Sequence, residues 1–217
     1  MGIRYLFSGF DNEKGFPEEL AEYLRVDITE TKLLLFIASS PDIPEKTDRY
    51  VHVNINWYEK IGLKFDEVKV IDNRISVDAS KELIKEASCI VLMGGNTLEQ
   101  IGFVHDYHLH ESIKNYNGIV CGISAGAINM GVKSLCSKDE DFDETIIYEG
   151  LGLVNFTIEP HFSAKRVEFI SQELYPISKL FPIYGLCDEA AIRVENDKSQ
   201  VIGDVYKIEY ESLERIS

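Results

Sequence analysis

The pentapeptide Gly122-Ile123-Ser124-Ala125-Gly126 holds the residues of this chain best suited to covalent chemistry. It follows an apolar run at 118–121 and precedes further small residues, so we expect it to join a buried strand to a helix. In that position the pattern G-x-S-x-G is typical of a nucleophile elbow, where two glycines permit a sharp turn and the serine stands at its tip. Amides at the start of the following helix favour negative charge there. Ser124 is therefore a candidate nucleophile, the alternative being a plain strand–helix turn.

A serine hydroxyl is a weak nucleophile at neutral pH, so Ser124 needs a base and an acid that orients the base. His161 is the only histidine after Ser124, and Pro160 stiffens the loop that carries it. Downstream, Asp188 and Glu189 end an apolar segment, and either could be the acid. The order serine, histidine, acid differs from that of α/β-hydrolases. We interpret His161 as the general base, although it and the two carboxylates could also be ordinary loop residues.

A glycine-rich turn, Gly94-Gly95-Asn96-Thr97, follows the apolar run at 89–92. Paired glycines let backbone N–H groups approach a ligand closely. Together with the amide of Ala125, these N–H groups would form an oxyanion hole beside the serine. The same turn could simply begin a helix, with Asn96 or Thr97 as the N-cap, and the two roles are compatible.

The other histidines do not indicate a metal site. His52 falls in an expected helix at 45–61, and the remaining ones cluster in a polar connection as His105, His108 and His110. No cysteine or second cluster accompanies them, so we interpret this segment as a surface loop. We accordingly expect no metal and no other cofactor.

The first 130 residues alternate between strand-like and helix-like segments. Apolar runs predict strands at 3–7, 32–38, 67–71, 89–92 and 119–121. Helical spacing predicts helices at 17–25, 45–61, 80–87, 97–103 and 110–115. Strands that alternate with helices favour an α/β fold with a mainly parallel sheet covered on both faces.

The second half of the chain is less regular. We expect an acidic surface loop at 138–144, short strands with glycine turns at 145–157 and a helix at 164–173. Late strands are predicted at 181–186, 190–195 and 200–209, the last two antiparallel around Asn196-Asp197. With no linker, repeat or low-complexity segment in the sequence, we expect one domain over residues 1–217.

The bulk composition is ordinary for a folded soluble protein. Of the 217 residues, 45% are hydrophobic and 27% charged. A formal charge of −15 argues against nucleic acids and anionic membranes as partners, which a basic surface would bind. It is equally consistent with plain solubility.

The expected compartment follows from the absence of membrane and disulfide patterns in the sequence. No apolar stretch reaches the length of a transmembrane helix, and the first residues lack a signal-peptide core and cleavage site. The cysteines form no C-x-x-C pair, and Cys89, Cys121 and Cys187 lie in or beside apolar runs, where we expect reduced thiols. We therefore predict a cytoplasmic protein.

Three of these motifs resemble those of peptidase family S51, the family of aspartyl dipeptidases and cyanophycinases. They are Gly94-Gly95-Asn96-Thr97, the elbow from Gly122 to Ala127, and Pro160-His161-Phe162, and they occur in the family's order. The strand pattern at both ends fits as well, so the resemblance covers nearly the whole chain. It is the combination that is specific, since each motif alone is common.

The resemblance implies a three-layer sandwich like the class I glutamine amidotransferases (flavodoxin-like), with serine in place of their elbow cysteine. It implies Ser124 as nucleophile, His161 as general base, and Gly94 or Gly95 with Ala125 as the oxyanion hole. Its aspartyl dipeptidases cleave dipeptides that begin with aspartate and need no metal. The expected substrate is thus a short peptide that contacts Asn96 and Thr97 in the glycine-rich turn.

The chain departs from the family pattern at three places. Met93 replaces the first of three glycines in the turn. Asp188 aligns with the family's triad glutamate, which makes Asp188 the expected third member and Glu189 the alternative. The segment after His161 is also shorter, and it is where we expect a basic residue to read a substrate carboxylate. Arg166 suits bidentate recognition better than Lys165, although both could lie on a solvated helix face.

We therefore predict a serine peptidase that forms an acyl-enzyme and favours dipeptides with an N-terminal aspartate. Two other functions stay open: a non-catalytic amidotransferase-like module that binds a small ligand, which the changes at Met93 and Asp188 would suit, and an esterase with the same elbow. A homodimer through a strand edge is a further possibility that no residue pattern supports.

Overall fold

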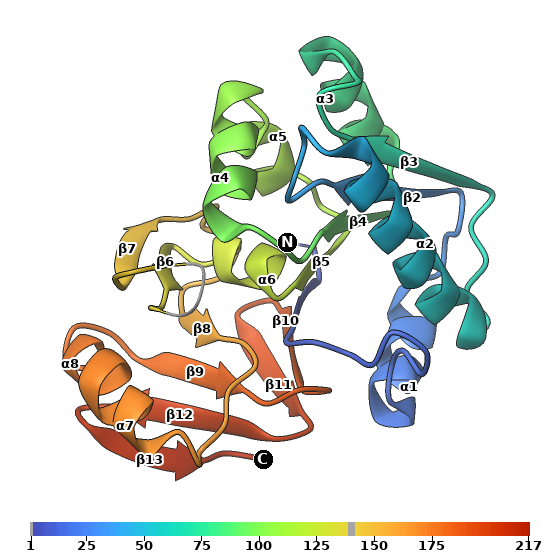
Figure 1. Cartoon of the computed structure of the whole chain (residues 1–217). Coiled ribbons are helices and arrows are strands. Elements are labelled where there is room, and N and C mark those ends of the chain that lie inside the picture. Colours follow the sequence, from blue (N-terminus) through green and yellow to red (C-terminus); the bar gives the residue numbers. More distant parts are fainter. Residues whose placement is uncertain (1, 139–141) are drawn as a thin grey trace.

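A seven-stranded, mainly parallel sheet forms the centre of the computed structural model, which describes residues 2–138 and 142–217 (Figure 1). Its strand order is β11-β10-β1-β5-β4-β2-β3. In chain order the strands are β1 (Arg4–Phe7), β2 (Leu33–Ile37), β3 (Glu67–Ile71), β4 (Cys89–Leu92), β5 (Ile119–Ile123), β10 (Ala191–Glu195) and β11 (Lys198–Ile202). Strands β1 to β5 run parallel, whereas β10 pairs antiparallel with both β1 and β11.

Helices cover both faces of this sheet, because its inner strands are apolar on both sides. In β2, Leu34 and Phe36 pack into one core, which α1 (Glu18–Asp27) and α2 (Pro44–Lys60) complete. The alternate residue Leu35 packs into the core on the opposite face. That second core is closed by α3 (Val77–Glu86), α4 (Thr97–Asp106), α5 (His110–Lys114) and α6 (Ala125–Asn129).

A second sheet, in the order β13-β12-β9-β8, lies beside the first at the lower left of Figure 1. Its strands are β8 (Thr157–Glu159), β9 (Ile183–Leu186), β12 (Val205–Glu209) and β13 (Ser212–Arg215). It packs against α7 (Val167–Phe169), the π-helical η1 (Ile170–Leu174) and α8 (Tyr175–Ser178). A two-stranded sheet is formed by β6 (Lys133–Cys136) and β7 (Ile146–Glu149). Among the described residues, every helix is too short or too polar to cross a membrane.

The expected elements of the first half are confirmed, with ends that differ by a few residues. In the second half, the strand expected at 200–209 is wrong. Gly203 adopts φ +72° and turns the chain there, so β11 and β12 belong to different sheets. The hairpin of β10 and β11 is confirmed, and Asn196 and Asp197 form its turn with positive φ.

Other expectations for this half need correction. The helix expected at 164–173 begins only at Val167 and continues as the π-helix η1. Strands β6 and β13 were not anticipated from the sequence. The acidic loop expected at 138–144 lies partly outside the described residues.

The carboxyl ends of β1, β5, β8 and β9 meet, and this meeting positions the site. In the parallel pair of β1 and β5, Phe7 lies opposite Ile123, so the residues that follow, Ser8 and Ser124, are neighbours. In the parallel pair of β8 and β9, Glu159 lies opposite Gly185, so the loops after both strands emerge together. Two pairs of strand ends from two sheets thus face each other.

Candidate active site

Ser124 stands at a strained turn between β5 and α6. Its backbone adopts φ +46° and ψ −106°, a region that costs free energy for a residue other than glycine. The Ser124 amide donates hydrogen bonds to the carbonyl oxygens of Phe7 at 2.9 Å and Ser8 at 3.1 Å, which hold the turn. A Cβ on Gly126 would lie 2.1 Å from the Leu92 carbonyl oxygen, so close packing on β4 requires this glycine. The geometry is that of the nucleophile elbow expected from the sequence.

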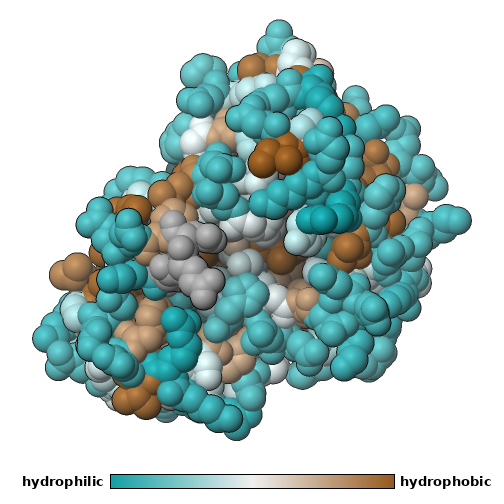
Figure 2. All heavy atoms as spheres, viewed as in Figure 1, coloured by the Kyte–Doolittle hydropathy of each residue, from teal (hydrophilic) through white to brown (hydrophobic). Residues whose placement is uncertain are grey.

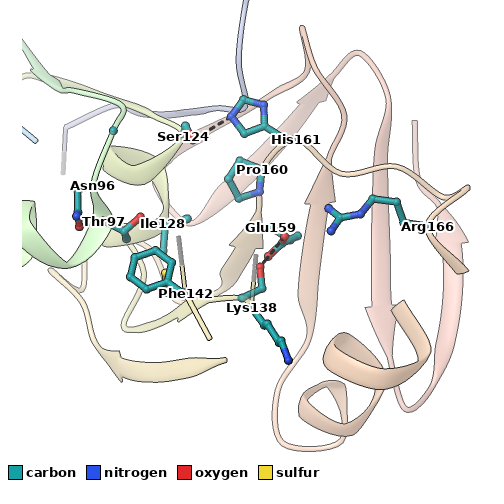
Figure 3. A pocket seen from close by; sticks show the side chains of 13 residues that line it. Asn96, Thr97, Ser124, Ile128, Lys138, Phe142, Glu159, Pro160, His161 and Arg166 are labelled. Carbon is teal, nitrogen blue, oxygen red and sulfur yellow. Dashed lines mark hydrogen bonds between the residues drawn. The ribbon is translucent and has the colours of Figure 1, made fainter. Parts of the chain in front are cut away.

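The structure brings Ser124, His161 and Asp188 into one chain of hydrogen bonds. His161 Nε2 lies 3.0 Å from Ser124 Oγ (Figure 3), and His161 Nδ1 lies 2.7 Å from Asp188 Oδ1. With the ring proton on Nδ1, the imidazole donates to the carboxylate and accepts from the serine hydroxyl. The side chains of His161 and Asp188 are 54% and 69% exposed, so their attraction contributes little to stability. What the pair provides is the orientation of the ring.

The alternative acid, Glu189, does not reach the imidazole. Its backbone adopts φ +68°, and its amide donates a 2.7 Å hydrogen bond to the Gly9 carbonyl oxygen, which closes a tight turn after Asp188. Within the described ranges, no hydrogen bond or ion pair joins Glu189 to His161. Of the two carboxylates expected from the sequence, the structure therefore brings only Asp188 to the histidine.

The amides expected to form an oxyanion hole lie around Ser124. Gly94 sits where an added Cβ would be 3.7 Å from Ser124 Cβ, and Gly95 adopts φ +137°, a conformation that requires glycine. Ser39 Oγ donates a 2.5 Å hydrogen bond to the Gly94 carbonyl oxygen and fixes this turn. No residue in the described part of the chain accepts a hydrogen bond from the amides of Gly94, Gly95 or Ala125. These donors are thus available to a bound oxygen.

The neighbouring Asn96 caps a helix. Its Oδ1 accepts hydrogen bonds from the amides of Leu98 and Glu99, each at 3.1 Å, and so satisfies the first turn of α4. The side chain still borders the cavity beside Ser124. As expected, the turn combines a capped helix with exposed backbone donors.

A cavity of about 280 Å³ opens beside Ser124, and three expected contact residues, Asn96, Thr97 and Arg166, line it (Figure 3). Arg166 stacks its guanidinium 3.9 Å from the centre of the Phe169 ring. Lys165 lies outside this cavity. The cavity also contains Glu159, which the sequence did not single out and which is only 5% exposed.

Glu159 gives the cavity an acidic wall. Its carboxylate accepts a hydrogen bond from Ser137 Oγ at 2.8 Å. It lies two residues before His161, at the end of β8. The cavity beside the serine therefore contains both a carboxylate and, from Arg166, a guanidinium.

Ser8 and Gly9, the two residues that follow β1, were also not singled out from the sequence. The buried Ser8 Oγ accepts a 2.7 Å hydrogen bond from the His161 amide and donates a 3.1 Å one to the Leu186 carbonyl oxygen. A Cβ on Gly9 would lie 2.4 Å from His161 Cε1 and 3.3 Å from Asp188 Oδ1. The only available signal was their place directly after a strand expected at the centre of a parallel sheet.

Two neighbouring groups titrate away from their ordinary values. Burial, followed by the charges of Asp204 and Asp188, raises the pKa of the Cys187 thiol, so this thiol stays protonated and is a poor competing nucleophile. Hydrogen bonds from the backbone amides of Lys14 and Glu13 lower the pKa of Asp11, which borders the open groove around His161 and Asp188. That groove is thus anionic.

The clustered histidines lie away from this site. His105 is in α4 and His110 in α5, with ring centres 6.0 Å apart, and His108 adopts φ +51° between the helices. In the ranges that the structure describes, no group of three histidine, cysteine, aspartate or glutamate side chains could hold a metal ion. Among the described residues, Cys89, Cys121, Cys136 and Cys187 form no disulfide, and all except Cys187 are buried.

Comparison with known proteins gives the family. A model of peptidase family S51 matches residues 6–202. The chain belongs to peptidase family S51. This confirms the resemblance seen in the sequence, and this S51 chain is a serine-type peptidase.

Curated relatives of the S51 chain are peptidase E proteins. One from Nostoc sp. (strain PCC 7120) is 28% identical over 216 residues, which cover 94% of this chain and 82% of that protein. One from Shewanella baltica (strain OS155) is 27% identical over 135 residues, and this match spans 57% of each protein.

Two solved structures share the fold. A peptidase from an acI-B1 actinobacterium superimposes with a TM-score of 0.72 at 17% identity, covering 100% of this chain and 94% of that one. A putative peptidase E protein from Listeria monocytogenes EGD-e gives a TM-score of 0.67 at 16% identity, covering 93% and 98%. At these identities the likeness concerns the fold alone.

The contact of Gly9 with the imidazole leads to a first prediction. Gly9→Ala is expected to lower peptidase kcat/KM about 100-fold, because the methyl group would displace the His161 ring from Ser124. Gly102→Ala in α4 is the matched control, since a Cβ there meets nothing within 4 Å. Both proteins should give wild-type circular dichroism spectra. Wild-type kcat/KM in Gly9→Ala would show that the ring position does not matter.

Proposed function

We propose that this S51 peptidase hydrolyses short peptides through an acyl-enzyme on Ser124, with a preference for dipeptides that begin with aspartate. The observation that carries the proposal is the hydrogen-bonded series Asp188–His161–Ser124 at the tip of a strained elbow. A serine held this way is paired with a base, and the base with an orienting acid. The reaction also requires an oxyanion hole, which the unused amides of the glycine-rich turn would provide.

The reaction follows from these contacts. Ser124 Oγ attacks the scissile carbonyl carbon as its proton passes to His161 Nε2, and Asp188 stabilises the imidazolium that forms. The amides of Gly94 or Gly95 and of Ala125 donate hydrogen bonds to the oxyanion. His161 then gives the proton to the leaving amine, and the acyl-enzyme remains. Water, deprotonated by His161, attacks the ester and releases the acid.

The charges in the cavity beside Ser124 support an N-terminal aspartate. That residue carries a side-chain carboxylate and a free ammonium group one carbon from the scissile carbonyl. The Arg166 guanidinium is suited to bind the carboxylate through two parallel hydrogen bonds. The buried Glu159 carboxylate is complementary to the ammonium group. Asn96 and Thr97 border the same space and would contact the bound residue.

The arrangement of strands and helices supports a related proposal about the fold. Parallel strands in the order β1-β5-β4-β2-β3, with helices on both faces and the nucleophile after β5, agree with a class I glutamine amidotransferase-like fold in which serine replaces cysteine. In this proposal the second sheet belongs to the same domain, because it carries His161 and Asp188.

Replacing the nucleophile tests the reaction. Ser124→Ala is expected to lower hydrolysis of X-Leu dipeptides and aminoacyl p-nitroanilides roughly 10³-fold or more, because no acyl-enzyme can form. The thermal unfolding midpoint, measured in parallel, should stay near the wild-type value. Full activity in Ser124→Ala would refute the mechanism. If the wild type turned over p-nitrophenyl esters but cleaved no peptide, it would be an esterase. If it showed neither turnover nor labelling by a fluorophosphonate, it would be a binding module.

The aspartate preference is tested separately. Arg166→Gln is expected to lower kcat/KM for Asp-Leu by roughly 10- to 100-fold, mainly through KM, while Ala-Leu changes little. Lys165→Gln is the matched control, because this neighbour lies outside the cavity beside Ser124. Equal losses on Asp-Leu and Ala-Leu would remove Arg166 as the residue that reads the side chain.

A further inference from the structure

Ser124 also borders a second cavity, of about 440 Å³, built from different elements. Its walls come from α2 and from the loop after β1, whereas the cavity with Arg166 is built from the start of α4, β8 and the segments around 137 and 166. Ser124, His161 and Gly95 line both cavities. The nucleophile therefore lies between two spaces, as it must if residues on both sides of a scissile bond are to be held.

One face of α2 lines this second cavity. Lys46, Tyr50, Asn54 and Trp57 follow each other at intervals of four, four and three residues, which places them along one side of the helix. Trp57 is nearly buried, and its Nε1 donates a 3.2 Å hydrogen bond to the Asn12 carbonyl oxygen. Its ring packs edge-on against Phe10, with centres 5.6 Å apart. The part of this wall around Trp57 is therefore aromatic and closely packed.

Asn54 is the residue that points to a ligand. Its side chain lines the cavity and the residue is only 4% exposed, yet within residues 2–138 and 142–217 its amide makes no side-chain hydrogen bond. Among the described residues, the only fully buried side-chain nitrogen or oxygen without a hydrogen bond is Tyr58 Oη, so the Asn54 amide is accessible from the cavity. This amide borders the cavity next to Ser124 and can donate a hydrogen bond to a ligand bound there.

Lys46 adds a positive charge to the same space. Its Nζ contacts only the Ser40 hydroxyl, at 3.4 Å, and it forms no ion pair with any carboxylate of the described residues. An ammonium group and an amide donor on one helix face are complementary to a carboxylate.

We propose that this cavity holds the C-terminal residue of the substrate. Its α-carboxylate binds Lys46 Nζ and Asn54 Nδ2, and its side chain packs against Phe10 and Trp57. The inference rests on the proposed function, since a dipeptide whose first residue fills the cavity with Arg166 must place its second residue on the other side of Ser124. It explains why the enzyme acts on dipeptides, because the carboxylate site lies one residue beyond the scissile bond.

The test compares Asp-Leu with Asp-Leu amide, which lacks only the C-terminal charge. The wild type is expected to have a higher kcat/KM for Asp-Leu, and Lys46→Met should lower the ratio of the two values by roughly 10-fold. Asn54→Leu, which keeps the shape without the amide donor, should lower the same ratio. Lys60→Met, the same change at the far end of α2, is the matched control and should keep the wild-type ratio.

A binding measurement separates this inference from the proposed function. Calorimetry of Asp-Leu and Asp-Leu amide with Ser124→Ala, alone and combined with Lys46→Met, measures the same preference without turnover. If peptides are not cleaved but the preference depends on Lys46, the proposed reaction fails and the carboxylate site stands. If the ratio in Lys46→Met and Asn54→Leu equals that of the wild type, in turnover or in binding, the carboxylate site is wrong.

Discussion

The buried hydroxyl of Ser8 joins the two sheets that position Ser124, His161 and Asp188. It accepts a hydrogen bond from the His161 amide, at the end of β8, and donates one to the Leu186 carbonyl oxygen, at the end of β9. Ser8 itself follows β1, the strand that holds the amide of Ser124. The strand end before Ser124 and the strand end before His161 are thereby held at hydrogen-bonding distance. This bridge lies next to the 3.0 Å contact between His161 and Ser124.

The charge of the outer surface differs from that of the cavities beside Ser124. Hydrophilic residues cover most of the face shown in Figure 2, and the chain has an excess of acidic groups. Around Ser124, by contrast, Arg166 and Lys138 line one cavity and Lys46 lines the other. A peptide with a negative charge at both ends would meet complementary charge at both ends, while the surface beyond would repel it. In the proposed function, recognition therefore depends on short-range contacts rather than on long-range attraction.

Much of this arrangement was predictable from the sequence, for reasons that are local. The continuous apolar runs predicted strands at 32–38 and 119–121, which the structure has at 33–37 and 119–123, and the glycines around Ser124 favoured a sharp turn. Residues whose roles depend on strand pairing were not predictable. Gly9 is close to His161 and Asp188 only because the loops after β8 and β9 meet the end of β1. The split of 200–209 into two sheets likewise depends on which partner each half pairs with.

The most direct test of the account is the rate at which a fluorophosphonate labels the protein, with the labelled residue mapped by mass spectrometry. We expect labelling on Ser124, slowed at least about 100-fold in Asp188→Asn, because the imidazole loses its oriented tautomer. Glu189→Gln, one residue along, should label at the wild-type rate. Labelling at another residue, or equal rates in Asp188→Asn and the wild type, would contradict the account.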